Sequence, residues 1–440
     1  MVLASLIIAG CSAEKSPGVA ERPCAELPAL EHAVNLKLGE SCGERVAEIR
    51  SIVGRDTLVR RFVLRPADSA ARKELPKGLA GATVLGTPVS RVVALSSAQL
   101  GYALRLGEGG RIVAVGEGQY VYDSTLYARV SGGGVAEVGN GPTLSLEKLM
   151  ALKPQLVMSF ATGGGQDDYE RIEALGLPLM LTSEWQEEHP LAKAEWIKLY
   201  GMLFGVETLA DSIYKQSKSK YLSSLASRLS SKNGGVAGVS PARGGSEQQC
   251  ASEGEASPNK PEVEIASPSA RNDTLSSFVS RLSSKSCPRV LVGMSYGGVW
   301  YAPGGNSYTA QLIKDAGGCY LWANDSSREL KFSLEEIIAL ADSADIWINP
   351  GMFSTPEEIL AAEPRAARIK AFKEKRVYQN DGRKGPGGGN DFYESAVAYP
   401  EKLLREMSQM TQIFAQNADS AKNAPSDSSR AQWYRNIFNF

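Results

Sequence analysis

The sequence predicts an α/β protein with two Rossmann-like lobes, joined by a single long α-helix and carrying a small N-terminal β addition. Short β-branched strands alternate with helical stretches, which is typical of a layered fold with a largely parallel sheet. This alternation occurs twice, before and after one long helical region. The 440 residues also exceed one domain of roughly 150 residues, so at least two units are expected.

The first lobe is predicted over residues 45–205. It opens with the β addition, in which residues 57–64 alternate apolar and polar side chains as an antiparallel strand does. From Arg91 the alternating α/β pattern begins. Strands are predicted at 91–95, 111–115, 156–160 and 177–181, and helices at 144–152 and 169–175.

The second half begins after a break in composition. Residues 206–232 are predicted to form the connecting helix, and residues 233–274 are rich in Gly, Ser, Pro and Glu, which predicts a disordered insertion. The second lobe is assigned to residues 275–440. Its strands are predicted at 289–294, 344–349 and 376–378.

Composition and motifs exclude several classes of function. A net charge of -1 and the lack of a basic stripe argue against nucleic-acid binding. The two histidines, His32 and His189, are far apart in sequence and offer little to a metal site or a proton relay, and His189 is expected to cap or pack at the helix that begins with Pro190. No glycine run fits a dinucleotide or phosphate-binding loop.

The N-terminus resembles a bacterial lipoprotein signal. A short apolar run over residues 1–11 ends in Ile8-Ala-Gly-Cys11, so Cys11 would be lipidated and residues 12–44 would form a tether. The run is too short to span a membrane. It departs from the signal pattern in one respect, because no Lys or Arg precedes Cys11. The resemblance implies a protein held by a lipid anchor at a periplasmic or cell-surface face of the membrane.

The sequence contains six cysteines and no metal-binding spacing. With Cys11 lipidated, Cys24 and Cys42 form the nearest plausible disulfide pair. The odd number that remains predicts at least one free thiol.

One helical element occurs in both lobes. Residues 144–152 and 332–340 share a Ser two positions before a Glu in the first helical turn, where a hydroxyl can cap the helix and a carboxylate suits its positive end. Capping explains the Ser and the Glu in each helix, but it does not explain why the same element occurs once in each lobe. We therefore expect Glu147 and Glu335 to be a matched pair of surface carboxylates.

These elements together resemble the class III substrate-binding proteins of ABC importers for ferric siderophores, haem or cobalamin. The resemblance lies in the order and spacing of seven segments: 87–96, 138–147, 151–157, 188–197, 298–307, 315–318 and 390–394. It implies that Glu147 and Glu335 dock on an ABC permease dimer. It also implies a monomeric binding protein with no catalytic activity, no resident metal and no cofactor, whose solute is a metal chelate.

Ligands of open α/β sheets bind beyond the carboxyl ends of the strands, and here those loops are rich in glycine and aromatic residues. Trp and Tyr provide large faces for a bulky planar or chelated solute, and Arg383 and Lys384 could meet its carboxylates. The predicted ligand-binding residues are Tyr120, Tyr122, Trp185, Tyr296, Trp300, Tyr301 and Arg383.

Two other readings stay open at this point. The first is an enzyme that acts on tetrapyrroles, such as a metal chelatase, which would need a histidine and carboxylate pair built from His189 with Glu184 or Glu187. The second is a surface lipoprotein that captures haem without a permease.

Overall fold

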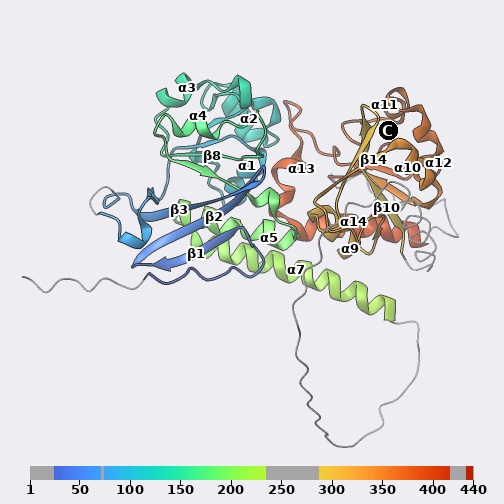
Figure 1. Cartoon of the computed structure of the whole chain (residues 1–440), viewed down its shortest axis with the longest axis horizontal. Helices are drawn as coiled ribbons and strands as arrows, with labels where there is room; N and C mark the ends of the chain where they lie inside the picture. The colour runs from blue at the N-terminus through green and yellow to red at the C-terminus, as the bar shows by residue number, and fades with distance from the viewer. Residues whose placement is uncertain (1–23, 71–73, 234–286, 417–432, 440) are drawn as a thin grey trace, which may run out of the picture.

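The computed structural model describes residues 24–70, 74–233, 287–416 and 433–439. Two α/β lobes lie side by side above one long helix, as Figure 1 shows. The predicted fold class is confirmed. Within the described residues, no helix is long and apolar enough to cross a membrane.

The N-terminal lobe is built on five parallel strands in the order β7-β6-β5-β8-β9. The central strands are fully buried, which explains their continuous apolar sequence. The strands are β5 (Val92–Ala94), β6 (Ile112–Val115), β7 (Ala136–Glu137), β8 (Leu156–Ser159) and β9 (Leu179–Leu181), and the helices are α1 (Ser97–Arg105), α2 (Ser124–Ser131), α3 (Leu146–Ala151), α4 (Tyr169–Glu173), α5 (Pro190–Glu195) and α6 (Ile197–Phe204).

The C-terminal lobe has a second sheet of the same kind, in the order β13-β10-β15-β16-β17, with only β17 antiparallel. A small antiparallel sheet, β11-β12-β14, packs beside it. The strands are β10 (Arg289–Val292), β11 (Met294–Tyr296), β12 (Val299–Pro303), β13 (Cys319–Tyr320), β14 (Glu329–Ser333), β15 (Ile346–Ile348), β16 (Val377–Gln379) and β17 (Arg435–Asn436), and the helices are α9 (Tyr308–Asp315), α10 (Leu334–Ala339), α11 (Pro356–Ala362), α12 (Lys370–Lys373), α13 (Asp391–Glu394) and α14 (Pro400–Gln416).

The N-terminal β addition is a four-stranded sheet in the order β1-β2-β3-β4, formed by β1 (Leu36–Ser41), β2 (Glu44–Val53), β3 (Asp56–Pro66) and β4 (Thr83–Thr87). The prediction of a tether over residues 12–44 was wrong for its second half, because residues 24–44 belong to the folded β addition. Cys24 forms a disulfide with Cys42, the pair that the sequence marked as the nearest plausible one. The apolar positions of β1 were too few to show as a strand in the sequence.

A second disulfide joins Cys287 to Cys319 and was not predicted. It links the start of β10 to β13, the strand that pairs with it. The sequence separation of 32 residues hid this proximity. The sequence positions 1–11 with Cys11, and residues 234–274 of the predicted insertion, lie outside the described residues.

Two buried carboxylates attach the β addition to the N-terminal lobe. Glu195 accepts hydrogen bonds from the backbone N–H groups of Glu31, His32 and Ala33, and from the Lys198 ammonium. Burial opposes the charge of Glu195, but Lys198 and these donors hold its pKa below the ordinary value. Glu187 accepts from the next two amides, Val34 and Asn35.

The connecting helix α7 (Glu207–Asn233) packs against both lobes. Tyr214 lies in the core of the N-terminal lobe, and Tyr221 lies in the core of the C-terminal lobe. The Tyr214 hydroxyl is 2.7 Å from His32 Nδ1, and the Tyr221 hydroxyl donates to Asp315 at 2.5 Å. One helix is thus fixed to each lobe by a buried tyrosine.

Candidate functional site

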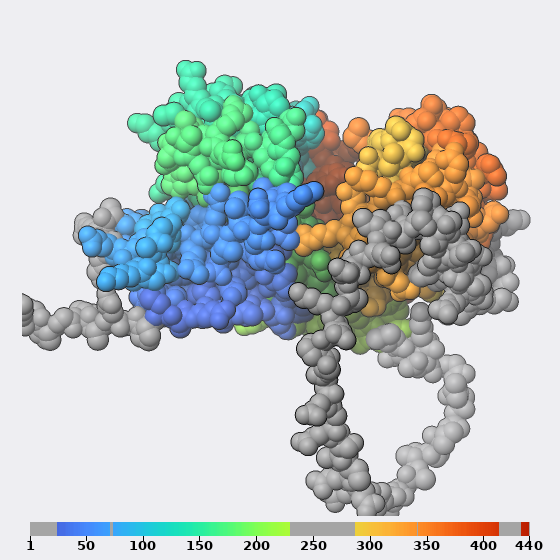
Figure 2. All heavy atoms as spheres, in the orientation of Figure 1, coloured from blue at the N-terminus to red at the C-terminus, as the bar shows by residue number. Residues whose placement is uncertain are grey.

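A groove separates the two lobes, as Figure 2 shows, and residues from late in the chain lie between its walls. In each sheet the strand order reverses once, between β5 and β8 in the first lobe and between β10 and β15 in the second. Ligands of open α/β sheets bind at such reversals, outside the carboxyl ends of the strands. The loops that follow these strands are therefore the candidate site.

Three predicted aromatic residues are exposed at the ends of other strands in the two lobes. Tyr120 follows β6 and Trp185 follows β9, with 54% and 44% of their surface exposed, and Tyr296 ends β11 in the other lobe. The Tyr296 hydroxyl accepts the backbone N–H of Met352, so the loops after β11 and β15 support each other. These side chains are placed where a flat, bulky solute could stack.

The structure brings two predicted residues into direct contact across the lobes. The Arg383 guanidinium donates to the Tyr122 hydroxyl from Nη2 at 2.8 Å, and its carbon lies 5.2 Å from the centre of the Tyr122 ring. Arg383 also forms an ion pair with Asp391 at 3.1 Å. The Arg383 guanidinium thus binds Tyr122 in the N-terminal lobe and Asp391 in the C-terminal lobe.

Lys384 is paired in a similar way. Its ammonium lies 3.3 Å from Asp381, which also binds Arg435. The sequence led us to expect Arg383 and Lys384 to meet carboxylates of a ligand. In the structure protein carboxylates already occupy them, so an anionic ligand would have to compete with these pairs.

The assignment of Trp300 to the ligand site was wrong. Trp300 is fully buried in the core of the C-terminal lobe, where its Nε1 donates to the Val292 carbonyl at 3.0 Å and its ring lies 5.5 Å from Trp347. Adjacent residues of a strand point to opposite faces, so Tyr301 lies on the exposed side of β12, near the Lys331 ammonium. The sequence could not tell which of the two faced inward.

The structure adds other large exposed side chains. Met352 is 86% exposed in the loop after β15, Phe160 is exposed directly after β8, and Tyr393 is exposed on α13. Phe160 directly follows a buried strand, which was a usable signal. Met352 follows the turn Asn349-Pro-Gly351, which needs positive φ angles at both ends and gave no sequence pattern we recognised.

The two histidines lie together, with ring centres 5.4 Å apart. His189 Nδ1 accepts the backbone N–H of Leu191 and caps α5, as expected, and burial lowers the pKa of both rings. Among the described residues, no cluster of three or more His, Cys, Asp and Glu side chains could hold a metal ion. The pair lies between the β addition, α5 and α7, where it serves packing.

The matched glutamates occupy equivalent positions. Glu147 is exposed in the first turn of α3 behind the cap Ser145, and Glu335 is exposed in the first turn of α10 behind the cap Ser333. Glu335 accepts from Arg365 at 2.7 Å, and its own backbone N–H together with Arg365 holds its pKa below the ordinary value. Glu147 and Glu335 are thus exposed carboxylates at equivalent helix starts in the two lobes.

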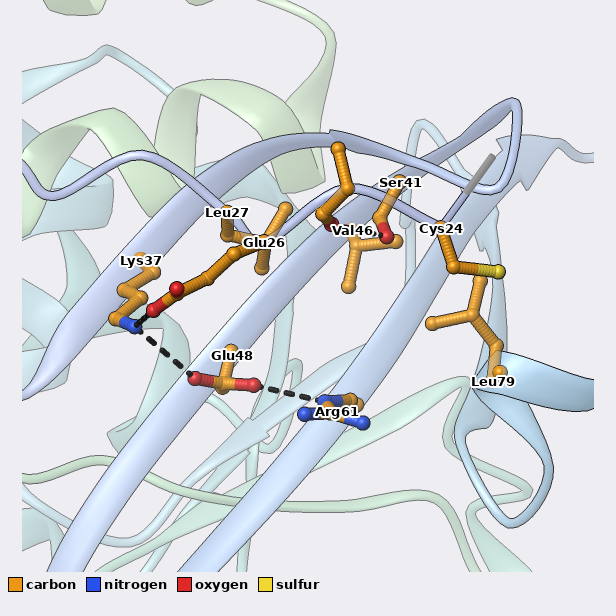
Figure 3. Close-up of a pocket in the computed structure, with 11 residues that line it drawn as sticks. Cys24, Glu26, Leu27, Lys37, Ser41, Val46, Glu48, Arg61 and Leu79 are labelled. Atoms are coloured by element: carbon orange, nitrogen blue, oxygen red, sulfur yellow. Dashed lines mark hydrogen bonds and ion pairs between the residues drawn. The ribbon is translucent and has the colours of Figure 1, made fainter. Parts of the chain in front are cut away.

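A second hollow lies on the β addition (Figure 3). It has a volume of about 310 Å³ and lies between the segment at Cys24, strands β1 to β3 and Leu79. Its charged rim is internally paired, because Lys37 contacts Glu26 and Glu48, and Arg61 contacts Glu48. This pairing leaves the rim without a free charge to recognise a solute.

The fold and the groove define a two-lobe binding protein whose lobes are joined by one helix. The chain belongs to the periplasmic binding protein family, whose sequence model matches residues 92–237 and 269–383. The family consists of binding proteins, and the predicted relationship is confirmed.

Individual relatives are distant. An uncharacterized lipoprotein of Methanocaldococcus jannaschii is 19% identical over 337 residues, covering 73% of this chain and 67% of the relative. A vitamin B12-binding protein of Vibrio parahaemolyticus is 28% identical over 105 residues, covering 24% and 36%. Among solved structures, a periplasmic binding protein of Veillonella parvula has a TM-score of 0.47 with 14% identity, covering 82% of this chain and 96% of that one. A periplasmic haem-binding protein of Vibrio cholerae has a TM-score of 0.45 with 14% identity, covering 72% and 98%.

Proposed function

We propose that this protein is the substrate-binding component of an ABC importer, that it is lipid-anchored on the outer side of the membrane, and that it captures a metal chelate. The solute would be a ferric siderophore, haem or cobalamin, and the protein would perform no chemistry on it. The observation that carries the proposal is the groove between two lobes with exposed aromatic residues at its strand ends. Family membership supports solute binding in general.

The chelate class is supported by the kind of surface in the groove. Tyr120, Trp185, Tyr296 and the flexible thioether of Met352 offer apolar area with few free charges. A chelate presents a large, rigid face and hides its metal charge, so stacking can supply most of its binding energy.

Titration of the protein with haem, several ferric siderophores and cobalamin tests this proposal. Trp185 is exposed in the loop after β9, so its fluorescence should be quenched by a solute that enters the groove. We expect saturable one-to-one quenching by one of these compounds, and a smaller quenching amplitude in Trp185→Phe, which keeps the other five tryptophans. If none of them binds, the proposed solute class is wrong.

Charge reversal at both matched glutamates should uncouple the protein from its permease. In Glu147→Lys with Glu335→Lys, we expect unchanged solute affinity and at least tenfold weaker stimulation of permease ATPase activity, because a positive charge in place of each carboxylate would repel the arginines on the permease. Glu170→Lys with Glu357→Lys is the matched control, since both residues are exposed in first helical turns of the same two lobes. Equal stimulation by both double variants would refute the docking assignment.

A further inference from the structure

The two lobes meet at the floor of the groove through α13. The glycine-rich segment before it, residues 385–389, lies against the loop at Tyr120 to Tyr122 of the other lobe, where side chains on Gly385 or Gly389 would collide with that backbone. On the opposite side of α13, a methyl group on Gly101 would collide with the carbonyl group of Glu394. The backbones of the two lobes therefore touch here with no side chain between them. A small change in the separation of the lobes would alter these backbone contacts directly.

Glu394 makes the principal polar contact across this joint. Its carboxylate accepts the backbone N–H of Tyr122 at 2.8 Å and that of Asp123 at 3.0 Å, and Glu394 is 1% exposed. The donors belong to the N-terminal lobe and the acceptor belongs to the C-terminal lobe. If the lobes part, these two bonds break and the carboxylate meets water.

The charged groups around Glu394 are already engaged elsewhere. Asp391, on the same helix, binds Arg383, and Asp123 caps α2 through Leu126. Arg105 on α1 donates to Ser217, and the Lys402 ammonium lies 4.0 Å from the centre of the Tyr399 ring. These groups line a cavity of about 240 Å³ beside Glu394.

Among the described residues, no cation forms an ion pair with Glu394. Burial therefore dominates and raises the pKa of Glu394 to about 7, with the two backbone donors opposing it and the charges of Asp391 and Asp123 adding to it. In water the same carboxyl group would titrate near its ordinary value of 4.5.

We propose that Glu394 is a pH-sensitive latch between the lobes, which holds them together in acid and releases them as the pH approaches neutrality. The sign follows from proton linkage: the joined state binds the proton more tightly than the parted state, so protons favour the joined state. The stabilisation is complete below about pH 4.5 and is lost as the pH rises to about 7.

Lys193 is another titratable group at the lobe interface, and it acts in the opposite direction. Lys193 on α5 lies 3.9 Å from the centre of the Tyr308 ring on α9, and burial lowers its pKa to about 8. Its neutral form favours the joined state only as the pH approaches 8 and above. Lys193 therefore contributes little to a pH dependence measured between pH 5 and pH 7.

Amide hydrogen exchange in the ligand-free protein tests the latch. We expect the protection factors of the Tyr122 and Asp123 amides, corrected for intrinsic exchange, to fall by about tenfold to fortyfold from pH 5 to pH 7, as two-state linkage with pKa values near 7 and 4.5 requires. In Glu394→Gln this fall should disappear, because the side-chain carboxamide of glutamine does not titrate.

Glu406→Gln is the matched control. Glu406 is also a buried acid with a pKa raised by burial to about 7, and it accepts the N–H groups of Trp433 and Tyr434, but all three residues lie in the C-terminal lobe. This variant should keep the pH dependence at Tyr122 and Asp123.

A flat profile in the wild-type protein, or an unchanged slope in Glu394→Gln, would overturn the proposal, and so would loss of the slope in Glu406→Gln. The wild-type profile decides the matter alone if a variant does not fold. An effect of the Glu394 latch on solute capture rests on the proposed function, but the hydrogen-exchange experiment needs no solute. A protein that binds no chelate could still show the latch, so the two proposals can fail separately.

Discussion

Trp300→Ala is expected to lower the free energy of unfolding by about 3 to 5 kcal/mol, the usual cost of removing a large aromatic side chain from a packed core. Trp300 has no exposed surface, and its Nε1 bond to Val292 and its contact with Trp347 would both be lost. Urea unfolding followed by circular dichroism measures this change.

Tyr120→Ala gives the complementary result. Tyr120 is 54% exposed, so its loss should change stability by no more than about 0.5 kcal/mol while weakening solute binding at least tenfold. The core assignment of Trp300 is contradicted if Trp300→Ala folds with wild-type stability, and the ligand assignment of Tyr120 is contradicted if its loss leaves affinity unchanged.

Glu195→Ala should cost at least about 3 kcal/mol of folding free energy, because removing one partner of a buried charged network leaves the others unpaired. Three backbone N–H groups and Lys198 would lose their acceptor. Thermal unfolding gives the size of the effect, and hydrogen exchange over residues 31–35 gives its location.

Glu108→Ala serves as the comparison for Glu195→Ala. Glu108 pairs with Arg111 in a partly exposed i, i+3 arrangement, which is worth no more than about 1 kcal/mol. If Glu195→Ala costs no more than Glu108→Ala, or leaves residues 31–35 fully protected, then Glu195 does not anchor the β addition.

The lobes could be predicted because their strands carry a local signal. Buried parallel strands such as β8 are continuous apolar runs, and their helices have caps that can be recognised in sequence, as at Ser145 and Ser333. Both signals depend on neighbouring residues only. The helix α7 and the equivalent positions of Glu147 and Glu335 could therefore be found without the structure.

The features that were missed depend on residues distant in sequence. Glu195 and the amides it binds are more than 160 residues apart, and Tyr122 and Arg383 are 261 residues apart. The choice between Trp300 and Tyr301 depended on which face of β12 meets the core, and both residues suit a strand equally well. The sequence therefore predicted which loops form the candidate site. It did not predict the contacts among their side chains, such as that between Tyr122 and Arg383.

The two tyrosines of α7 also fix the distance between the lobes. Tyr214 and Tyr221 are seven residues apart, close to two full turns, so they project from one side of the helix at positions about 10 Å apart along its axis. Inserting one residue between them would rotate one tyrosine by about 100° relative to the other, and only one could stay in its core. The seven-residue interval thus sets both the spacing of the lobes and their relative rotation. The width of the groove therefore depends on the number of residues between two positions of the connecting helix.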